Sequence, residues 1–412
     1  MQVMYKICCG IDVHKMKIVC CLKKGNKQEI REFSAETKEL RSIARWLEEN
    51  KCEMIAMEST GSFWKPLWNV FEDEGLKQML CNAKDMKNVP GKKTDIKDSE
   101  WICDLLQHGL LKASYIPDRD QRELRELIKY RESMIEERTR ELNRLQKMLE
   151  GANIKVVSKF SKLENKTCRG LIDYILKLEE DEEIEEKEVK KLINKNVKSS
   201  LEDIMIAMEG VVTPLQKELM KKVIEHINDM AERIEELNEM VNRYMSKYEE
   251  NIKKLEKIPG IGKRNAQVIL AEIGQDMNQF PTAGHLASWA GVCPGNNESA
   301  GKRRSGKTRK GNQILKKTLV QSANSSKRHK DSFYYAQYQR IMIHRGKKRA
   351  TVAVAHSILI SIYYMLKYDK EYTELGAQFY NQFNTEKKIK SYIKKLHELG
   401  VDINVDTSLL KA

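Results

Sequence analysis

Cysteine is scarce in this chain, with nine residues in 412, and four of them form the adjacent pairs Cys8 with Cys9 and Cys20 with Cys21. So few cysteines do not make a disulfide scaffold, and adjacent pairs lack the spacing of zinc-binding or redox CxxC motifs. No uncharged apolar run approaches the roughly 20 residues that cross a bilayer. The N-terminal stretch MQVMYKICCGIDVHK places an Asp and a Lys where a signal peptide needs apolar residues and a cleavage site. We therefore expect a reduced, cytoplasmic protein without a membrane span.

Charged residues, by contrast, make up 33% of the chain, beside 41% hydrophobic residues. The hydrophobic share excludes wholesale disorder, and the length predicts two to three domains. Net charge is +14, yet the segment 302–349 alone carries sixteen Lys or Arg against one acid, Asp331, for +15. Because each neutralised phosphate releases condensed counterions, a positive field confined to one module predicts nucleic-acid binding. The alternative is a basic surface that only keeps the protein soluble.

Strand and helix patterns alternate over the first hundred residues. Short apolar runs predict strands at 4–13, 15–24, 28–34, 51–59 and 76–82, and helical spacing predicts helices at 37–50, around 64–71 and at 94–108. The order is three strands, helix, strand, helix, strand, helix. It predicts a mixed sheet with helices on its faces.

The middle of the chain reads as long helices. Residues 118–150 and 213–257 are rich in Glu, Lys, Arg, Leu and Met, and the second stretch repeats apolar residues every three or four positions. This pattern predicts antiparallel helices or a coiled coil, with the partner helix from the same chain or from a second copy. After Lys257 glycine becomes frequent, and the last hundred residues return to helix. We expect domains at 1–115, 116–256 and 257–412.

Four carboxylates stand at positions that favour chemistry. Asp12 ends the first predicted strand, Glu58 ends the fourth, and Asp95 and Asp98 lie three apart at the start of a helix, on one face. Crowded carboxylates repel unless hard cations hold them, and oxygen ligands suit Mg²⁺ or Mn²⁺. Two such ions about 4 Å apart would clamp the attacking and leaving oxygens of a phosphodiester. Each acid alone is more simply a surface, turn or first-turn residue; together they resemble the RuvC and ribonuclease-H-like nucleases.

The glycine-rich sequence IPGIGK at 258–263, followed by a helical pattern, predicts a helix-hairpin-helix. Gly260 and Gly262 would permit the tight turn, and the exposed N–H groups beside Lys263 would hold a DNA phosphate without reading sequence. The alternative is a plain glycine-rich turn between helices.

Ser299 lies among small residues directly before a cationic run. A serine oxygen attacks only when its proton is removed or the phosphate is polarised, and nearby cations neutralise charge on a phosphorus transition state. The cations of this run are Lys302, Arg303, Arg304, Lys307, Arg309 and Lys310. No His is near, and neither a GxSxG elbow nor a GxxxxGK[ST] phosphate loop is present. The alternative is a serine in a flexible DNA-contacting loop.

Taken together, GIDVHK at 10–15, MEST at 57–60, KTDIKDSEWICDLL at 93–106 and the segment 258–312, which ends in ESAGKRRSGKTRKGN, resemble the IS110 family of insertion-sequence transposases. These enzymes are also called DEDD transposases or bridge-RNA-guided serine recombinases. The resemblance implies a RuvC-like domain, a helical coiled-coil region and a C-terminal transposase domain. The acidic tetrad falls on Asp12, Glu58, Asp95 and Asp98, and the catalytic serine on Ser299, with Ser305 as a nearby competitor. Many relatives have Ala where this chain has Ser99, and residues 150–212 match nothing recognisable.

The resemblance further implies site-specific DNA recombination through a 5′-phosphoserine, with Mg²⁺ or Mn²⁺ on the acids and rejoining without ATP. Its implied partners are donor and target DNA, a structured bridge RNA, and further copies of the chain in a dimer or tetramer. The acids and Ser299 lie about 200 residues apart, which allows a composite active site built across subunits. The setting would be the cytoplasm and nucleoid of a bacterium or archaeon. Two alternatives remain open: a RuvC-like, metal-dependent junction endonuclease with water as the nucleophile, and a non-catalytic nucleic-acid-binding scaffold.

Overall fold

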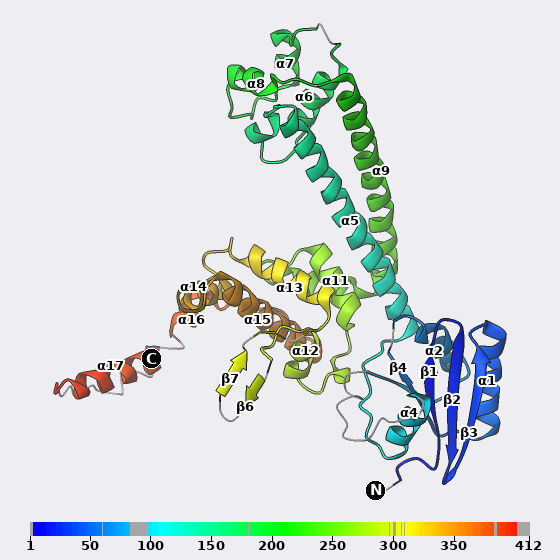
Figure 1. The fold of residues 1–412 in the computed structure, drawn as a ribbon. Coiled ribbons are helices and arrows are strands. Elements are labelled where there is room, and N and C mark those ends of the chain that lie inside the picture. Colours follow the sequence, from blue (N-terminus) through cyan, green and yellow to red (C-terminus); the bar gives the residue numbers. More distant parts are fainter. Residues whose placement is uncertain are drawn as a thin grey trace. The chain divides into compact units, whose positions relative to one another are not determined.

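The structure is a computed structural model of the chain and describes residues 3–59, 61–82, 98–179, 182–295, 297–299, 302–305, 307–308, 310–382 and 385–401. The chain forms two compact units, Met1–Asp120 and Gln121–Ala412. Figure 1 traces the elements of both along the chain.

The first unit is built on one mixed sheet. Its strands are β1 (Ile7–Val13), β2 (Lys17–Lys24), β3 (Lys27–Ser34), β4 (Met54–Glu58) and β5 (Gln78–Cys81), in the order β3-β2-β1-β4-β5. The first three strands pair antiparallel, whereas β4 pairs parallel to β1 and to β5. The helices are α1 (Thr37–Glu49), α2 (Trp64–Asp73) and α4 (Asp98–Gln107). The predicted mixed sheet is confirmed, and it is consistent with a RuvC-like domain.

Helices cover both faces of this sheet, so its central strands are buried on both sides. Successive strand residues point to opposite faces. Cys9 and Ile11 join the core under α1 and α2, where Leu47 and Phe71 are fully buried. On the other face Cys8 packs in the smaller core that includes residues of α4. The continuous apolar runs of β1 and β2 follow from this double burial.

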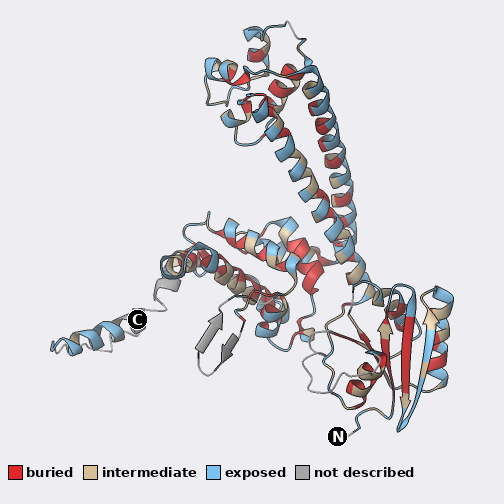
Figure 2. Ribbon diagram, viewed as in Figure 1, coloured by how far each residue is buried: buried red, intermediate tan, exposed pale blue. Residues whose placement is uncertain are grey.

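In the second unit two long helices run side by side, α5 (Arg119–Gly151) and α9 (Pro214–Tyr244) (Figure 1). Met134 of α5 packs against Met230 and Leu237 of α9. Buried residues form a stripe along each helix (Figure 2). α9 begins sharply because Thr213 and Gln216 form a capping box and Pro214 occupies the first turn.

The short elements between these helices have a core of their own. They are η1 (Val156–Lys159), α6 (Lys166–Lys177), α7 (Glu186–Leu192) and α8 (Leu201–Met208). Leu171 and Ile172 of α6 pack with Leu149 of α5 and Ile224 of α9. The described residues of 150–212, a stretch that matched no recognised motif, therefore form a packed cap on the two long helices.

The rest of the second unit is a helical domain with one small hairpin. Its elements are η2 (Ser246–Tyr248), α10 (Glu249–Glu256), α11 (Lys263–Ile273), η3 (Met277–Gln279), α12 (Ala283–Trp289), β6 (Asn297–Ser299), β7 (Lys302–Ser305), α13 (Gln313–Ser326), α14 (Phe333–Arg345), α15 (Lys347–Tyr368), α16 (Gly376–Gln382) and α17 (Thr385–Glu398). α15 packs against α12, α13 and α14. The expected return to helix is confirmed.

By length and composition α15 could cross a membrane, so the expectation that no such apolar stretch exists was wrong. Half of its most apolar window is buried inside the protein. The apolar residues on one face of the helix, among them Val354, Ile358 and Ile362, are fully buried. This is how the core helix of a globular domain is built, and length and composition alone do not distinguish the two cases.

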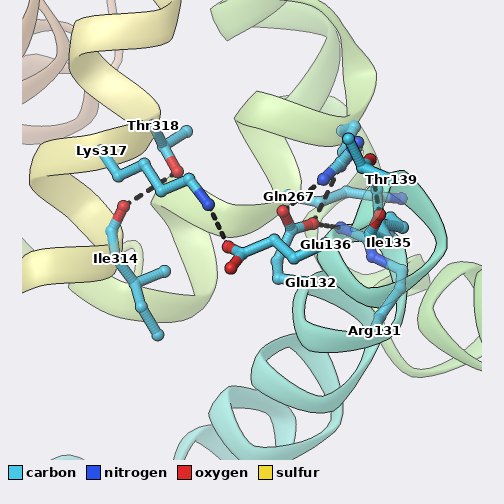
Figure 3. Close-up of polar contacts among 10 residues, drawn as sticks. Arg131, Glu132, Ile135, Glu136, Thr139, Gln267, Ile314, Lys317 and Thr318 are labelled. Carbon is cyan, nitrogen blue, oxygen red and sulfur yellow. Dashed lines mark hydrogen bonds and ion pairs between the residues drawn. The ribbon is translucent and has the colours of Figure 1, made fainter. Parts of the chain in front are cut away.

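Polar contacts join α5 to the helical domain (Figure 3). The guanidinium of Arg131, only 1% exposed, donates to Gln267 Oε1 of α11 over 2.8 Å. Burial lowers the pKa of Arg131, and its neighbour Glu132 partly offsets that effect. Glu136, one turn further along α5, is paired with Lys317 of α13. α5 is thus joined to α11 by a buried hydrogen bond and to α13 by an ion pair.

Candidate functional site

Two of the predicted acids lie at the ends of adjacent parallel strands. β1 and β4 pair in the register Ile11 with Met57, so the next residues along each strand, Asp12 and Glu58, come side by side. Glu58 is the last residue of β4. Because parallel strands end at the same edge of a sheet, the fold brings together two acids that are 46 positions apart in the sequence.

Gly10 brings the third acid to this edge. A Cβ placed on Gly10 would lie 2.3 Å from Cys103 N and 2.4 Å from Ser99 O, both backbone atoms of α4. Only a residue without a side chain lets a helix lie so close on a strand. Asp98 is the first residue of α4, next to Ser99, and so stands beside the end of β1.

The pKa of the Asp12 carboxyl also reflects the nearby negative charges. Burial raises the pKa of its carboxyl most; the negative charges of Asp98 and Glu58 raise it further, while His14 lowers it. His14 Nε2 lies 3.0 Å from Asp12 Oδ2. The Asp12 side chain keeps 20% of its surface exposed, so a bound group can reach it. A carboxylate with two like charges nearby costs free energy that a cation would recover.

The donor set fits a hard divalent cation, because it consists of carboxylates alone. Among the described residues, however, no three such side chains already stand at coordinating distance. Asp95, the remaining predicted acid, lies outside the described residues. Three of the four predicted acids therefore lie near one edge of the sheet, and metal binding by all four stays a prediction.

The glycine-rich turn joins α10 to α11. Gly260 has a φ of +94°, and a Cβ there would lie 2.3 Å from Ser322 O of α13, so the turn packs directly on that helix. Gly262 precedes α11 with open space around it, no side chain caps the helix, and Lys263 is its exposed first residue. A helix start of this kind has free N–H groups that suit an anion. Phosphate binding at this turn remains a prediction.

The candidate serine lies on a short β-hairpin that the sequence analysis treated as a turn and loop. Ser299 ends β6 and pairs with Lys302, the first residue of β7; Glu298 pairs with Arg303. The competing Ser305 is the last residue of β7 and pairs with Asn297. The backbone ladder thus places Ser299 next to the first cation of the run. The role of Ser299 as nucleophile stays a prediction.

The hairpin rises from a firmly closed base. Gly295 N donates to Lys307 O over 2.9 Å, and Asn312 N donates to Trp289 O over 3.1 Å. A Cβ on Gly311 would lie 2.4 Å from Gly291 N, so two backbone segments touch there. Asn312 also caps α13 and donates to the buried Glu272. Sequence reasoning missed this base; the small residues on both sides of the basic run were its signal.

The basic residues spread around this hairpin. Lys302, Arg303 and Arg304 belong to β7, whereas Arg309 lies outside the described residues. Lys310 lines a hollow of about 470 Å³ together with Lys316 and Lys317 of α13. Lys307 lines a larger cavity on the side of α15. The charge predicted from composition therefore gathers on the hairpin, on α13 and at the start of α15.

Two regions of the chain match the profiles of known protein families. Residues 9–154, which include the described acids, match the DEDD transposase profile of IS110 type, described as a transposase. Residues 252–339, which include the glycine-rich turn and Ser299, match the profile described as Transposase IS116/IS110/IS902 family. The chain belongs to the IS110 family of transposases.

One relative is a protein of Streptomyces coelicolor described as the insertion element IS110 uncharacterized 43.6 kDa protein. It is 44% identical to this chain over 71 residues, which is 17% of either chain. The match thus spans about a sixth of that relative's length.

Proposed function

We propose that this protein is the transposase of an insertion sequence and acts as a site-specific DNA recombinase. The observation that carries the proposal is the gathering of Asp12, Glu58 and Asp98 at one edge of a mixed sheet, by strand register and by the close approach at Gly10. Both matched regions support it, because one contains these acids and the other contains Ser299.

In this proposal Asp12, Glu58, Asp95 and Asp98 hold Mg²⁺ or Mn²⁺. The match to the DEDD profile favours a divalent metal. Burial and the nearby charges of Asp98 and Glu58 raise the pKa of Asp12, and a bound cation would offset this cost of its negative charge. A divalent ion, when bound, supplies positive charge that polarises a phosphate and stabilises a leaving oxygen. His14, next to Asp12, fixes the orientation of that carboxylate.

Ser299 is the proposed nucleophile. As its Oγ forms a bond to phosphorus, the bond from phosphorus to O3′ breaks, which gives a 5′-phosphoserine and a free 3′-hydroxyl; the serine proton is lost and the 3′-oxygen gains one. Lys302, Arg303 and Arg304 neutralise charge on the phosphate during this step. Reversal on a new 3′-hydroxyl rejoins strands without ATP, because the covalent bond conserves the phosphodiester energy.

The proposed partners are donor DNA, target DNA, a structured bridge RNA and further copies of this chain. The +15 segment 302–349 and the uncapped start of α11 beside Gly262 supply the charge and the N–H groups for phosphate contacts. Recognition of sequence then rests on pairing with the RNA, since phosphate contacts carry no sequence information.

The test is a denaturing gel with labelled element DNA, its flanking RNA and Mg²⁺. We expect a covalent protein–DNA adduct with the wild type and with Ser305→Ala, and none with Ser299→Ala. A matched control comes from the hairpin itself, since Ser299 and Ser305 end its two strands.

Cleavage that persists in Ser299→Ala without any adduct would instead identify a junction endonuclease that uses water. Asp12→Asn and Glu58→Gln keep the size of each side chain but remove its charge, and both should abolish cleavage while nucleic-acid binding persists. If cleavage survives both changes, the acidic edge is not the metal site.

A further inference from the structure

A cavity of about 1030 Å³ lies beside the hairpin, between its base and α15. One wall consists of Pro294, Lys307 and Thr308. Backbone contacts hold this wall, since Pro294 and Thr308 form a β-bridge and Gly295 N donates to Lys307 O. Its volume is just above the roughly 300–1,000 Å³ that is typical of ligand sites.

The opposite wall is one face of α15. Lining residues recur on it at helical spacing, as Lys348, Val352 and His356 do, with Arg349, Ala353 and Ser357 directly after them. The opposite face of the helix is buried in the protein core. The wall is therefore fixed by packing, and the small side chains of Ala353 and Ser357 leave the hollow open.

The chemistry of this lining is specific. Lys307, Lys348 and Arg349 are exposed cations, whereas Val352 and Ala353 present a half-buried apolar surface. Gln337 of α14 donates through Nε2 to Ser357 Oγ over 2.8 Å, and its buried Oε1 has no hydrogen-bond partner among the described residues.

His356 completes the polar part. It is half-buried, and burial lowers its pKa, so its imidazole is neutral near pH 7 with one donor and one acceptor nitrogen. An amide and a neutral imidazole at an apolar wall match the edge and the face of a nucleobase. Three cations at the rim match the phosphate attached to it.

We propose that this cavity receives an unpaired nucleotide of the DNA strand that the protein cuts, with its base against Val352 and Ala353 and its phosphate at the cations. This inference rests on the proposed function and adds how the strand is held. The hairpin that forms one wall also carries Ser299, so the nucleotide bound here belongs to the strand beside the nucleophile. A nucleotide held in this way fixes the backbone next to it, and so orients the neighbouring phosphate for attack.

The experiment uses the full-length protein and DNA duplexes that carry 2-aminopurine, which brightens when it leaves the base stack. One duplex has a single unpaired 2-aminopurine, and a second is fully paired. For the wild type we expect brightening and about tenfold tighter binding of the first duplex, in line with one or two net hydrogen bonds from the base to Gln337 and His356. Ala353→Leu fills the hollow and should remove both effects.

The matched control is Ala231→Leu on α9, also at a partly exposed helical position and away from the cavity. It should behave as the wild type. His356→Ala and Lys348→Gln provide the test if Ala353→Leu does not fold. Each removes one hydrogen bond or phosphate contact and should lower the preference for the unpaired duplex at least about threefold.

Equal affinity for both duplexes, or unchanged brightening in all three cavity variants, would overturn the inference. Tighter binding of the same unpaired sequence as RNA would overturn its assignment to the cut strand. The adduct assay is independent of this readout. If Ser299→Ala still forms an adduct while the wild type brightens 2-aminopurine and Ala353→Leu does not, the proposed nucleophile is wrong and the cavity assignment stands.

Discussion

Gly10→Ala tests the close contact that gathers the acids. The added Cβ would lie 2.3 Å from Cys103 N, 2.4 Å from Ser99 O and 2.8 Å from Cys103 Cα, all of them backbone atoms. Ordinary contacts of a Cβ begin at 3.4 Å, so α4 must retreat from β1 by about 1 Å. No rotamer change relieves a clash with backbone. We therefore expect the upper end of overpacking costs, about 3 kcal/mol in the free energy of unfolding of the first unit.

The same retreat carries Asp98 away from Asp12. A misplacement of about 1 Å in a catalytic group costs roughly a hundredfold in rate, so DNA cleavage should fall by that factor even where the protein stays folded. The loss should appear in the turnover rate more than in DNA affinity, because the basic segment 302–349 is untouched.

Buried thiols supply the assay for the stability change. Cys8 and Cys103 face each other between β1 and α4, with their Sγ atoms 3.8 Å apart, and both are fully buried. A change of 3 kcal/mol should speed their labelling by a thiol reagent roughly a hundredfold. Gly151→Ala is the control, since nothing lies within 4 Å of its Cβ position at the end of α5. Unchanged labelling and full cleavage in Gly10→Ala would refute the reasoning.

Three further changes test other parts of the structure. Ser99→Ala removes a fully buried hydroxyl that has no hydrogen-bond partner among the described residues, so stability should stay equal or rise by about 1 kcal/mol in urea denaturation; a clear loss would contradict this. Arg131→Met should cost about 1–3 kcal/mol because it leaves Gln267 Oε1 without its donor, and adding Gln267→Leu should recover much of that loss in a double-mutant cycle. DNA affinity should fall steeply with salt, with a slope near −5 if the 302–349 segment neutralises about six phosphates; a flat response by fluorescence anisotropy would argue against that surface.

The fold of the first unit follows from sequence patterns because its signals are local. Apolar runs in β1 and β2 and the helical spacing of Leu40, Ile43 and Leu47 all gave elements within a few residues of their bounds. β4 starts at Met54 and not at 51, because Lys51 adopts a φ of +55° that ends the preceding helix. Local patterns fix what an element is more reliably than where it begins.

Other features depend on contacts between distant residues and gave no local signal. The core that 150–212 forms with α5 and α9, and the cavity between α15 and the hairpin, arise only when segments far apart in sequence pack together. The candidate acids could be predicted because strand ends are recognisable in the sequence. Their common edge, however, depends on the register of β1 with β4, which no local pattern records.

Gly10 and Gly311 show how this chain positions its candidate groups. At each, a Cβ would lie within 2.4 Å of another segment's backbone, and each stands next to a region that carries predicted site residues. Gly10 allows α4 to lie close to β1. Gly311 packs against Gly291 and so closes the base of the hairpin that carries Ser299. Side chains at these two contacts would leave the acids and the serine chemically intact but displaced. Gly311→Ala should therefore slow adduct formation in the gel assay roughly a hundredfold, although it changes no atom of the proposed nucleophile; an unchanged rate would show that this contact does not position Ser299.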